Sequence, residues 1–194
     1  AAGRFNIDVV SLAKGSRAVS ADAAFGTSSD VVTASGGNLT FAAGTKNFTL
    51  AVDPGATLTQ LRDAINSSST NFGVSATIIN TGGTSPQSRL VLTSNVSGEG
   101  NDLTITGSSA EFDKVATSAF GGGAGGMGIA LADKASSARI KVDGIESVSD
   151  SNIFTNAIQD MSITVSKETT VGTPIVMNVE TDKGGAKKSI ESLI

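Results

Sequence analysis

Residues 58–79 read LTQLRDAINSSSTNFGVSATII, and this stretch decides the fold class. In its first part Leu58, Leu61 and Ile65 follow the three- and four-residue spacing that gives a helix one apolar face. In its second part, from Val74 onwards, apolar and polar residues alternate as they do in a half-buried strand. A short helix that runs directly into a strand predicts a β-rich domain in which the helix packs on a sheet.

Turn and capping residues mark the ends of this helix. Residues 53–55 (Asp-Pro-Gly) predict a turn, because proline presets φ and glycine tolerates positive φ. Thr57 is the expected N-cap, and Gln60 completes a capping box three residues later. The serine run after Asn66 competes for the hydrogen bonds of the helix. We therefore predict a helix over 57–66, with its apolar face packed in the core.

Alternating apolar residues elsewhere predict strands separated by turns. These strands are expected near residues 5–10, 39–41, 48–52, 89–93, 103–106, 138–142, 145–148, 161–165 and 175–179. Turns at 43–46 and 143–144 predict hairpins. The fold class is mainly β (β-rich α+β), with two small antiparallel-β domains. One domain carries the short helix on a single sheet, and the other is discontinuous.

The first strand, in RFNIDVVSLAKG, has no obvious partner within residues 38–108. We expect it to pair with C-terminal strands, so that the helix-bearing domain is an insertion. The expected domains are a discontinuous β head domain of residues 1–34 and 130–182, an inserted β domain of residues 35–129, and the start of a leg helix at 183–194. The small-residue stretch 16–37 is expected to be a flexible connection, and the Gly-rich loop 120–128 a mobile linker.

Composition excludes most catalytic chemistry. The 194 residues include no His and no Cys, which removes the usual metal ligands and both Ser-His-Asp and Cys-His catalysis. Carboxylate-pair hydrolysis stays open because Asp and Glu total 18. Asp53, Asp63 and Asp102 lie in turn or helix contexts that do not predict a catalytic pair. We expect no enzyme, no catalytic residue, no metal site and no cofactor.

Charge and hydropathy limit the classes of partner that the sequence allows. A net charge of −4 with no basic stripe predicts no nucleic-acid partner. No apolar run approaches the roughly 20 residues that cross a bilayer, and no secretory signal precedes the first strand, so we expect no membrane partner. Asp143-Gly144 is expected to be a turn and not a calcium ligand. Lys183, Lys187 and Lys188 are expected on a solvated helix face.

Three stretches resemble, in order, the flagellar hook-associated protein 2 family of bacterial filament cap proteins. RFNIDVVSLAKGSRAVS is similar to the strand after the family's N-terminal leg. LTQLRDAINSSSTNFGVSATIIN with SRLVLTSNVSGEGNDLTITG resembles the flagellin hook IN motif, whose Ile-Asn is here Ile65-Asn66. ARIKVDG and the residues after it resemble the start of the C-terminal region, through Val142-Asp143-Gly144, 149–152 and 175–179. Leu193 stands where the family usually has an aromatic residue, and the Gly-rich loop has no counterpart.

The resemblance implies a structural protein and not an enzyme. The family's cap is a homo-oligomeric ring at the distal flagellar tip, with a pentamer as one expected stoichiometry, beneath which flagellin folds into place. This chain would supply the β-rich heads of the plate without the helical legs. The implied partners are further copies of itself, flagellin, hook–filament junction proteins, and a host mucin or glycan. The implied location is extracellular, after export by the flagellar type III apparatus.

Three alternatives stay open. The first is another axial flagellar protein, a flagellin or a hook–filament junction protein, which the block 138–194 would distinguish from a cap. The second is an extracellular adhesin or glycan-binding module. The third is a carboxylate-based glycosidase, which requires two facing acids across a cleft. As an isolated fragment, the chain is expected to be monomeric or weakly associated.

Overall fold

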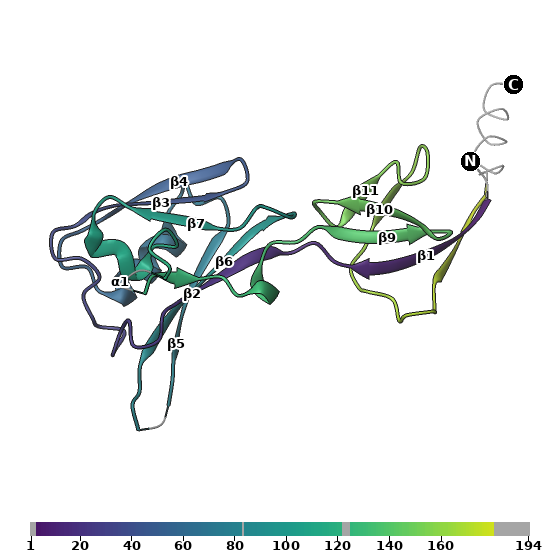
Figure 1. Cartoon of the computed structure of the whole chain (residues 1–194). Helices are drawn as coiled ribbons and strands as arrows, with labels where there is room; N and C mark the ends of the chain where they lie inside the picture. The colour runs from purple at the N-terminus through teal and green to yellow at the C-terminus, as the bar shows by residue number, and fades with distance from the viewer. Residues whose placement is uncertain (1–2, 83, 122–124, 181–194) are drawn as a thin grey trace, which may run out of the picture. The chain divides into compact units, whose positions relative to one another are not determined.

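The computed structural model describes residues 3–82, 84–121 and 125–180 and divides into two compact units (Figure 1). One unit combines Ala1–Ala13 with Ser137–Ile194, and the other is Lys14–Ser136. We call them the discontinuous unit and the inserted unit. Every strand pair in both is antiparallel. The mainly β fold class predicted from the sequence is confirmed.

The discontinuous unit is built on a four-stranded sheet. Its strands are β1 (Gly3–Ser11), β9 (Ala138–Val142), β10 (Ile145–Ser149) and β13 (Ile175–Val179), in the order β10-β9-β1-β13. A two-stranded sheet of β11 (Ile153–Thr155) and β12 (Ser162–Thr164) belongs to the same unit. In Figure 1 the purple β1 lies beside the green β9, far away in sequence. The prediction that the first strand pairs with C-terminal strands is confirmed.

The inserted unit holds two sheets and helix α1 (Leu58–Ser67). One sheet has the order β5-β6-β2-β8, from Val74–Asn80, Ser88–Ser97, Gly15–Ser20 and Met127–Gly128. The other has the order β4-β3-β7, from Lys46–Val52, Gly37–Ala43 and Thr104–Gly107. Two 3-10 helices are η1 (Ala110–Val115) and η2 (Leu131–Asp133). The prediction of a single sheet under the helix is therefore wrong.

The stretch 16–37 is not a flexible connection, and the prediction fails at β2. This strand lies inside its sheet between β6 and β8, with Ala18 opposite Leu92. Its inward-facing residues include serines: the buried hydroxyl of Ser16 accepts a hydrogen bond from the N–H of Leu103 at 2.7 Å, and that of Ser20 accepts one from Leu90 at 3.0 Å. Because buried serines are polar, residues 15–20 do not show the alternation of apolar and polar residues from which strands are predicted.

The unit boundaries consequently differ from the expected domains of 1–34 with 130–182 and 35–129. Residues 14–34 belong to the inserted unit because β2 pairs with β6. The Gly-rich stretch 120–128 also contributes to that unit: Met127 is buried, and β8 pairs with β2. The prediction of a linker throughout 120–128 is wrong at its end. The expected helix at 183–194 lies outside the described residues.

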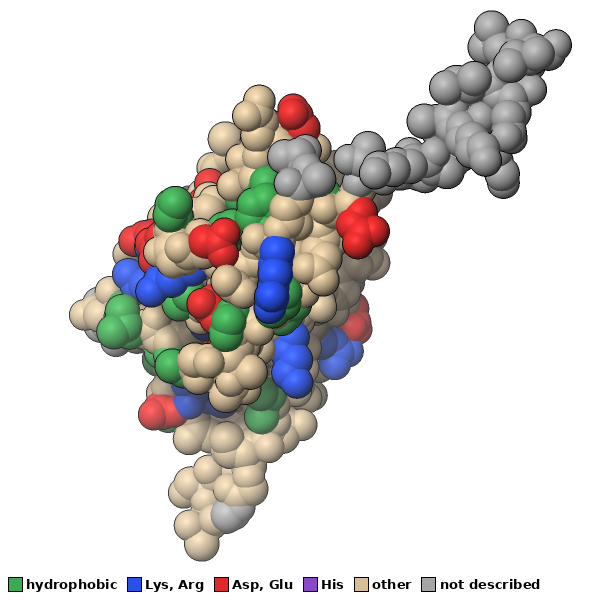
Figure 2. All heavy atoms as spheres, turned by 90° about the vertical axis from the view of Figure 1, so that its right-hand side faces the viewer, with side chains coloured by type: hydrophobic (Ala, Val, Ile, Leu, Met, Phe, Trp, Pro, Cys, Tyr) green, Lys and Arg blue, Asp and Glu red, His purple; other side chains and the backbone are tan. Residues whose placement is uncertain are grey.

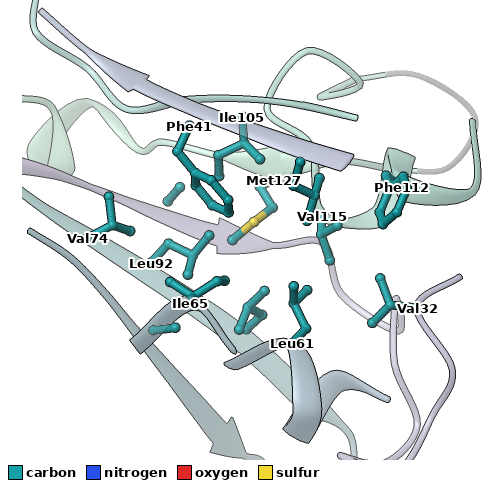
Figure 3. Packing of buried hydrophobic residues seen from close by; sticks show 14 of the residues in the cluster. Val32, Phe41, Leu61, Ile65, Val74, Leu92, Ile105, Phe112, Val115 and Met127 are labelled. Atoms are coloured by element: carbon teal, nitrogen blue, oxygen red, sulfur yellow. The ribbon is translucent and has the colours of Figure 1, made fainter. Parts of the chain in front are cut away.

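The core of the inserted unit lies between α1 and the two sheets (Figure 3). The helix contributes Leu61 and Ile65, which are almost fully buried. Strand residues converge on them from both sheets, among them Phe41, Leu92 and Ile105. Burying one such side chain contributes about 1.5–3 kcal/mol. The apolar helix face predicted from the sequence is confirmed as core.

Candidate functional site: segment 57–80 and the sheet edges

The start of α1 is fixed by side chains and by an upstream segment. The Thr57 hydroxyl accepts a hydrogen bond from the Gln60 N–H at 3.3 Å, and the Gln60 side chain accepts one from the Thr57 N–H at 2.8 Å. This confirms the predicted capping box. The carbonyls of Asp30 and Ser28 accept hydrogen bonds from the next two free amides of the helix. All of these amides would otherwise be without partners.

One carboxylate anchors the segment that covers this helix start. Glu111, in η1, accepts hydrogen bonds from the Thr33 hydroxyl at 2.6 Å and from the N–H groups of Ala34 and Ser35 at 2.7 and 3.0 Å. The Ser35 hydroxyl adds a fourth donor at 2.9 Å. These hydrogen bonds, that of Thr33 foremost, lower the pKa of Glu111 from 4.5 to about 2. Sequence reasoning missed this contact because its partners are almost 80 residues apart.

Two asparagines of the segment close the first part of the outer edge of β5. The Asn66 side chain donates to the Ala76 carbonyl at 2.9 Å and accepts from the Ala76 N–H at 2.8 Å. Asn71 does the same for Val74, at 2.7 Å in each direction. A neighbouring strand would make the same pair of bonds to each residue. The sequence reading treated Asn66 only as the end of the helix; the missed signal is that both partners are alternate residues of one strand.

Polar side chains pair with other backbone groups in the same manner. Asn152 donates to the carbonyl of Ala13, which lies between β1 and β2, at 3.0 Å and accepts from its N–H at 2.7 Å. On β7, the Thr117 hydroxyl accepts from the Ile105 N–H at 2.7 Å, and the Thr117 N–H donates to the Ile105 carbonyl at 2.9 Å. Closed edges cannot accept a further strand from another chain.

The edge strands of the four-stranded sheet in the discontinuous unit carry exposed apolar side chains. Strands β10 and β13 end its four-stranded sheet on opposite sides. Large apolar side chains on them are exposed: Ile145 and Val148 on β10, Ile175 and Val176 on β13. On the face that Figure 2 shows, hydrophobic side chains lie singly or in small groups between charged ones. These two edges are the candidate interaction surfaces of the unit.

The acids considered in the sequence do not form a catalytic pair. Asp63 pairs with the adjacent Arg62 at 2.6 Å, and Asp102 accepts from the Ala135 N–H at 2.7 Å. No hydrogen bond or ion pair joins any two of Asp53, Asp63 and Asp102. Across residues 3–82, 84–121 and 125–180, no cluster of three or more acidic residues is arranged to hold a metal ion. Within the same ranges, no helix is long and apolar enough to span a membrane.

Asp143 and Gly144 form the predicted turn between β9 and β10, with φ of 48° and 86°. Both angles suit a two-residue hairpin. The Asp143 carboxylate accepts from the Asn6 N–H at 2.9 Å, which ties the turn to β1. The proposed solvated lysines at 183, 187 and 188 lie outside the described residues.

Comparison with known proteins adds two family matches. Residues 38–96 match the family model described as the flagellin hook IN motif. Residues 135–194 match the one described as the flagellar hook-associated protein 2 C-terminus. The first covers the asparagine-closed edge of β5, and the second covers β9 to β13.

Named relatives agree with both matches. Flagellar hook-associated protein 2 of Aeromonas caviae is 42% identical over 163 residues, which are 84% of this chain and 32% of that protein. The A-type flagellar hook-associated protein 2 of Pseudomonas aeruginosa is 30% identical over 203 residues, 99% of this chain and 41% of that protein. The chain thus spans 32% and 41% of the length of these two relatives.

Solved structures share the fold. The crystal structure of FliD from Pseudomonas aeruginosa PAO1 has a TM-score of 0.74 at 30% identity, covering 100% of this chain and 86% of that one. The D2-D3 domains of the flagellar cap protein from Serratia marcescens have a TM-score of 0.77 at 22% identity, covering 93% and 94%. At that lower identity, the second similarity speaks for the fold alone.

Proposed function

The chain belongs to the flagellar hook-associated protein 2 family, and from this membership we propose that it is the head of a filament cap protein that assembles at the flagellar tip and promotes flagellin polymerisation. The observation that carries the proposal is the match of residues 135–194 to the family's C-terminus. The IN motif at 38–96 is also typical of flagellins, whereas this second block is not. The combination favours a cap over another axial protein.

In the proposed assembly, helical legs of the whole protein reach the filament and the β-rich heads form the plate. Further copies of the protein, flagellin and hook–filament junction proteins are its partners, outside the cell. A ring whose symmetry differs from that of the filament leaves one gap at a time for the next flagellin. Each unit here has a hydrophobic core of its own, so it can present surfaces without help from the legs.

The proposed role is architectural and not catalytic. The carboxylates with the most partners, such as Glu111, bind backbone and hydroxyl groups of their own unit. A chain without cysteine also passes through an export channel without cross-linking. Hairpins such as β3–β4 and β9–β10 are local and can form early after export.

Complementation by a chimera tests this function. The segment of Aeromonas caviae hook-associated protein 2 that aligns with this chain is replaced by residues 1–194, in a strain lacking its own gene. We expect filaments, motility and little flagellin in the medium. The original segment, reinserted at the same junctions, serves as control for the junctions. A chimera that is exported at normal levels while monomeric flagellin leaks and no filament grows would refute the proposal.

A further inference from the structure

We propose that β10 of one copy of this chain pairs with β13 of the next copy, head to tail, so that the four-stranded sheets of neighbouring heads join into one. This inference rests on the proposed function, because a cap ring requires head-to-tail contacts between identical subunits. The inference specifies three things that the proposed function leaves open: the surface, the strand register and the residues that make the contact.

The first step is that both strands carry free backbone groups. The N–H and C=O of Val9 bond to Thr169, on the side of β1 that faces β13. Alternate residues of a strand point to the same side, so Ile7 also faces β13 and bonds to Ile175. The backbone groups of Val176 and Asn178 must then point outward. No described residue hydrogen-bonds to them.

The same alternation applies to β10. Its two-residue turn makes Val142 and Ile145 a hydrogen-bonded pair, so Ser147 also faces β9. The backbone groups of Glu146 and Val148 therefore point away from the sheet, again without a partner among the described residues. Polar groups pair with outward backbone groups of Val74 and Ala76 on β5 and of Ile105 on β7, whereas no described residue pairs with the outward groups of β10 and β13.

The second step is the apolar character of the two open edges. Val148 is 50% exposed and Val176 is 42% exposed. Neither strand contains Lys or Pro, the residues that commonly protect an edge from pairing. The edge strand β4 of the inserted unit, by contrast, begins with Lys46 and exposes Asn47 and Thr49. β10 also carries Glu146, which pairs with Arg139 of β9, so the partner that fits is another strand edge with an exposed valine.

The third step is strand direction, which selects a second copy as that partner. The four strands are joined by three antiparallel pairs, so β10 and β13 of one copy run in opposite directions. A second copy placed alongside in the same orientation offers its β13 antiparallel to β10. The new junction then has the same geometry as every other pair in the sheet.

The fourth step is register. Both strands have five residues, and their full overlap pairs Glu146 with Asn178 and Val148 with Val176. These are the residues whose backbone groups point outward on each side. The same register places Ile145, which faces the core side with Val142, beside Val179. A five-residue junction is small, which agrees with the weak association that we expect of the isolated chain.

Disulfide trapping tests the junction, because the chain has no cysteine of its own. Val148→Cys and Val176→Cys chains are mixed at high concentration and oxidised. A hydrogen-bonded antiparallel pair has Cα atoms about 5.5 Å apart, within the range that a disulfide spans. We expect mixed dimers from the two single variants, and a ladder of dimers, trimers and larger species from the double variant.

Two matched controls identify the contact. Val10→Cys is exposed on the central strand β1, and mixed with Val148→Cys it is expected to give no product. Asn178→Pro removes only an outward N–H and is expected to abolish the ladder, whereas Asn178→Ala is expected to keep it. Circular dichroism confirms that both variants fold. The proposal is overturned if mixed dimers are no more abundant than the Val10→Cys product, or if one single variant dimerises with itself at least as well.

The double variant in the Aeromonas caviae chimera separates this inference from the proposed function. Filament growth without any ladder would refute the β10–β13 junction and leave the cap function standing. A ladder from the purified chain, with a chimera that leaks flagellin, would refute the cap function and leave the junction standing.

Discussion

The side chain of Asn66 bonds to both backbone groups of Ala76, at 2.8 and 2.9 Å, and so ties the end of α1 to the edge of β5. The amide occupies the place of a neighbouring strand. The asparagine of the IN motif therefore does more than end a helix: it also prevents another chain from pairing with that part of the sheet.

Replacing Asn66 with alanine is expected to lower the free energy of unfolding of the inserted unit by about 1–3 kcal/mol, because two backbone groups of Ala76 lose their partner. Urea unfolding measures the change. Asn47→Ala, on the exposed face of β4, is the control, with an expected change within about 0.5 kcal/mol. Equal effects of the two substitutions would contradict the role given to Asn66.

Glu111→Gln is expected to destabilise the inserted unit in a pH-dependent manner. The folded-state pKa is lowered from 4.5 to about 2, so the charged carboxylate stabilises the fold above pH 4.5. This contribution is lost as the pH falls from about 4.5 to about 2. The difference in Tm between the two proteins should therefore be largest near neutral pH and vanish in acid.

Thermal unfolding at several pH values measures this difference. Asp113→Asn lies in the same 3-10 helix, and none of the hydrogen bonds to the segment 33–35 involves its side chain. It is therefore expected to leave the pH profile unchanged. A Glu111→Gln protein whose Tm stays parallel to that of the wild type from pH 7 to acid would count against the anchor.

Gly144→Ala is expected to destabilise the discontinuous unit by about 1–2 kcal/mol, because Gly144 has a φ of 86° in the β9–β10 turn. A methyl group there meets nothing within 4 Å, so the cost is conformational. Gly82→Ala is the control: it too meets nothing within 4 Å, and no left-handed φ applies. Its effect should be neutral or slightly stabilising. Hydrogen exchange of β9 and β10 amides distinguishes the two.

Ser16→Ala is expected to cost about 1–3 kcal/mol, although it removes one oxygen atom from a residue that looks unimportant in the sequence. The Leu103 N–H is buried and donates to that hydroxyl at 2.7 Å. Without it the donor has no partner. Chemical denaturation measures the loss, and Ser85→Ala, at an exposed position between β5 and β6, gives the comparison with a surface serine. A change of less than about 0.5 kcal/mol for Ser16→Ala would contradict the assignment.

The local parts of this fold could be predicted from the sequence. Helix α1 with its Thr57–Gln60 box and the Asp143-Gly144 hairpin depend on neighbouring residues, and both were predicted correctly. Strand β2 could not be recognised, because all three of its buried side chains are small and two of them are serines. Its omission also led to the prediction of one sheet where there are two.

The candidate surfaces were harder to predict than the fold. Whether an edge is open depends on side chains outside the strand itself, such as Asn66 for Ala76 on β5 and Thr117 for Ile105 on β7. Those pairings are set by packing, and no spacing rule contains them. The resemblance to cap proteins pointed to an assembly role, while the open edges came only from the structure.

The two ends of the inserted unit meet in a β-bridge, where Lys14 and Ser136 exchange hydrogen bonds of 3.0 Å in both directions. Because the first and last residues of the inserted unit lie side by side, the whole unit can be replaced by another one without changing the path of the chain in the discontinuous unit. Sequence changes confined to this module would leave the four-stranded sheet of the discontinuous unit unaltered, because that sheet takes its strands from residues on either side of the insertion.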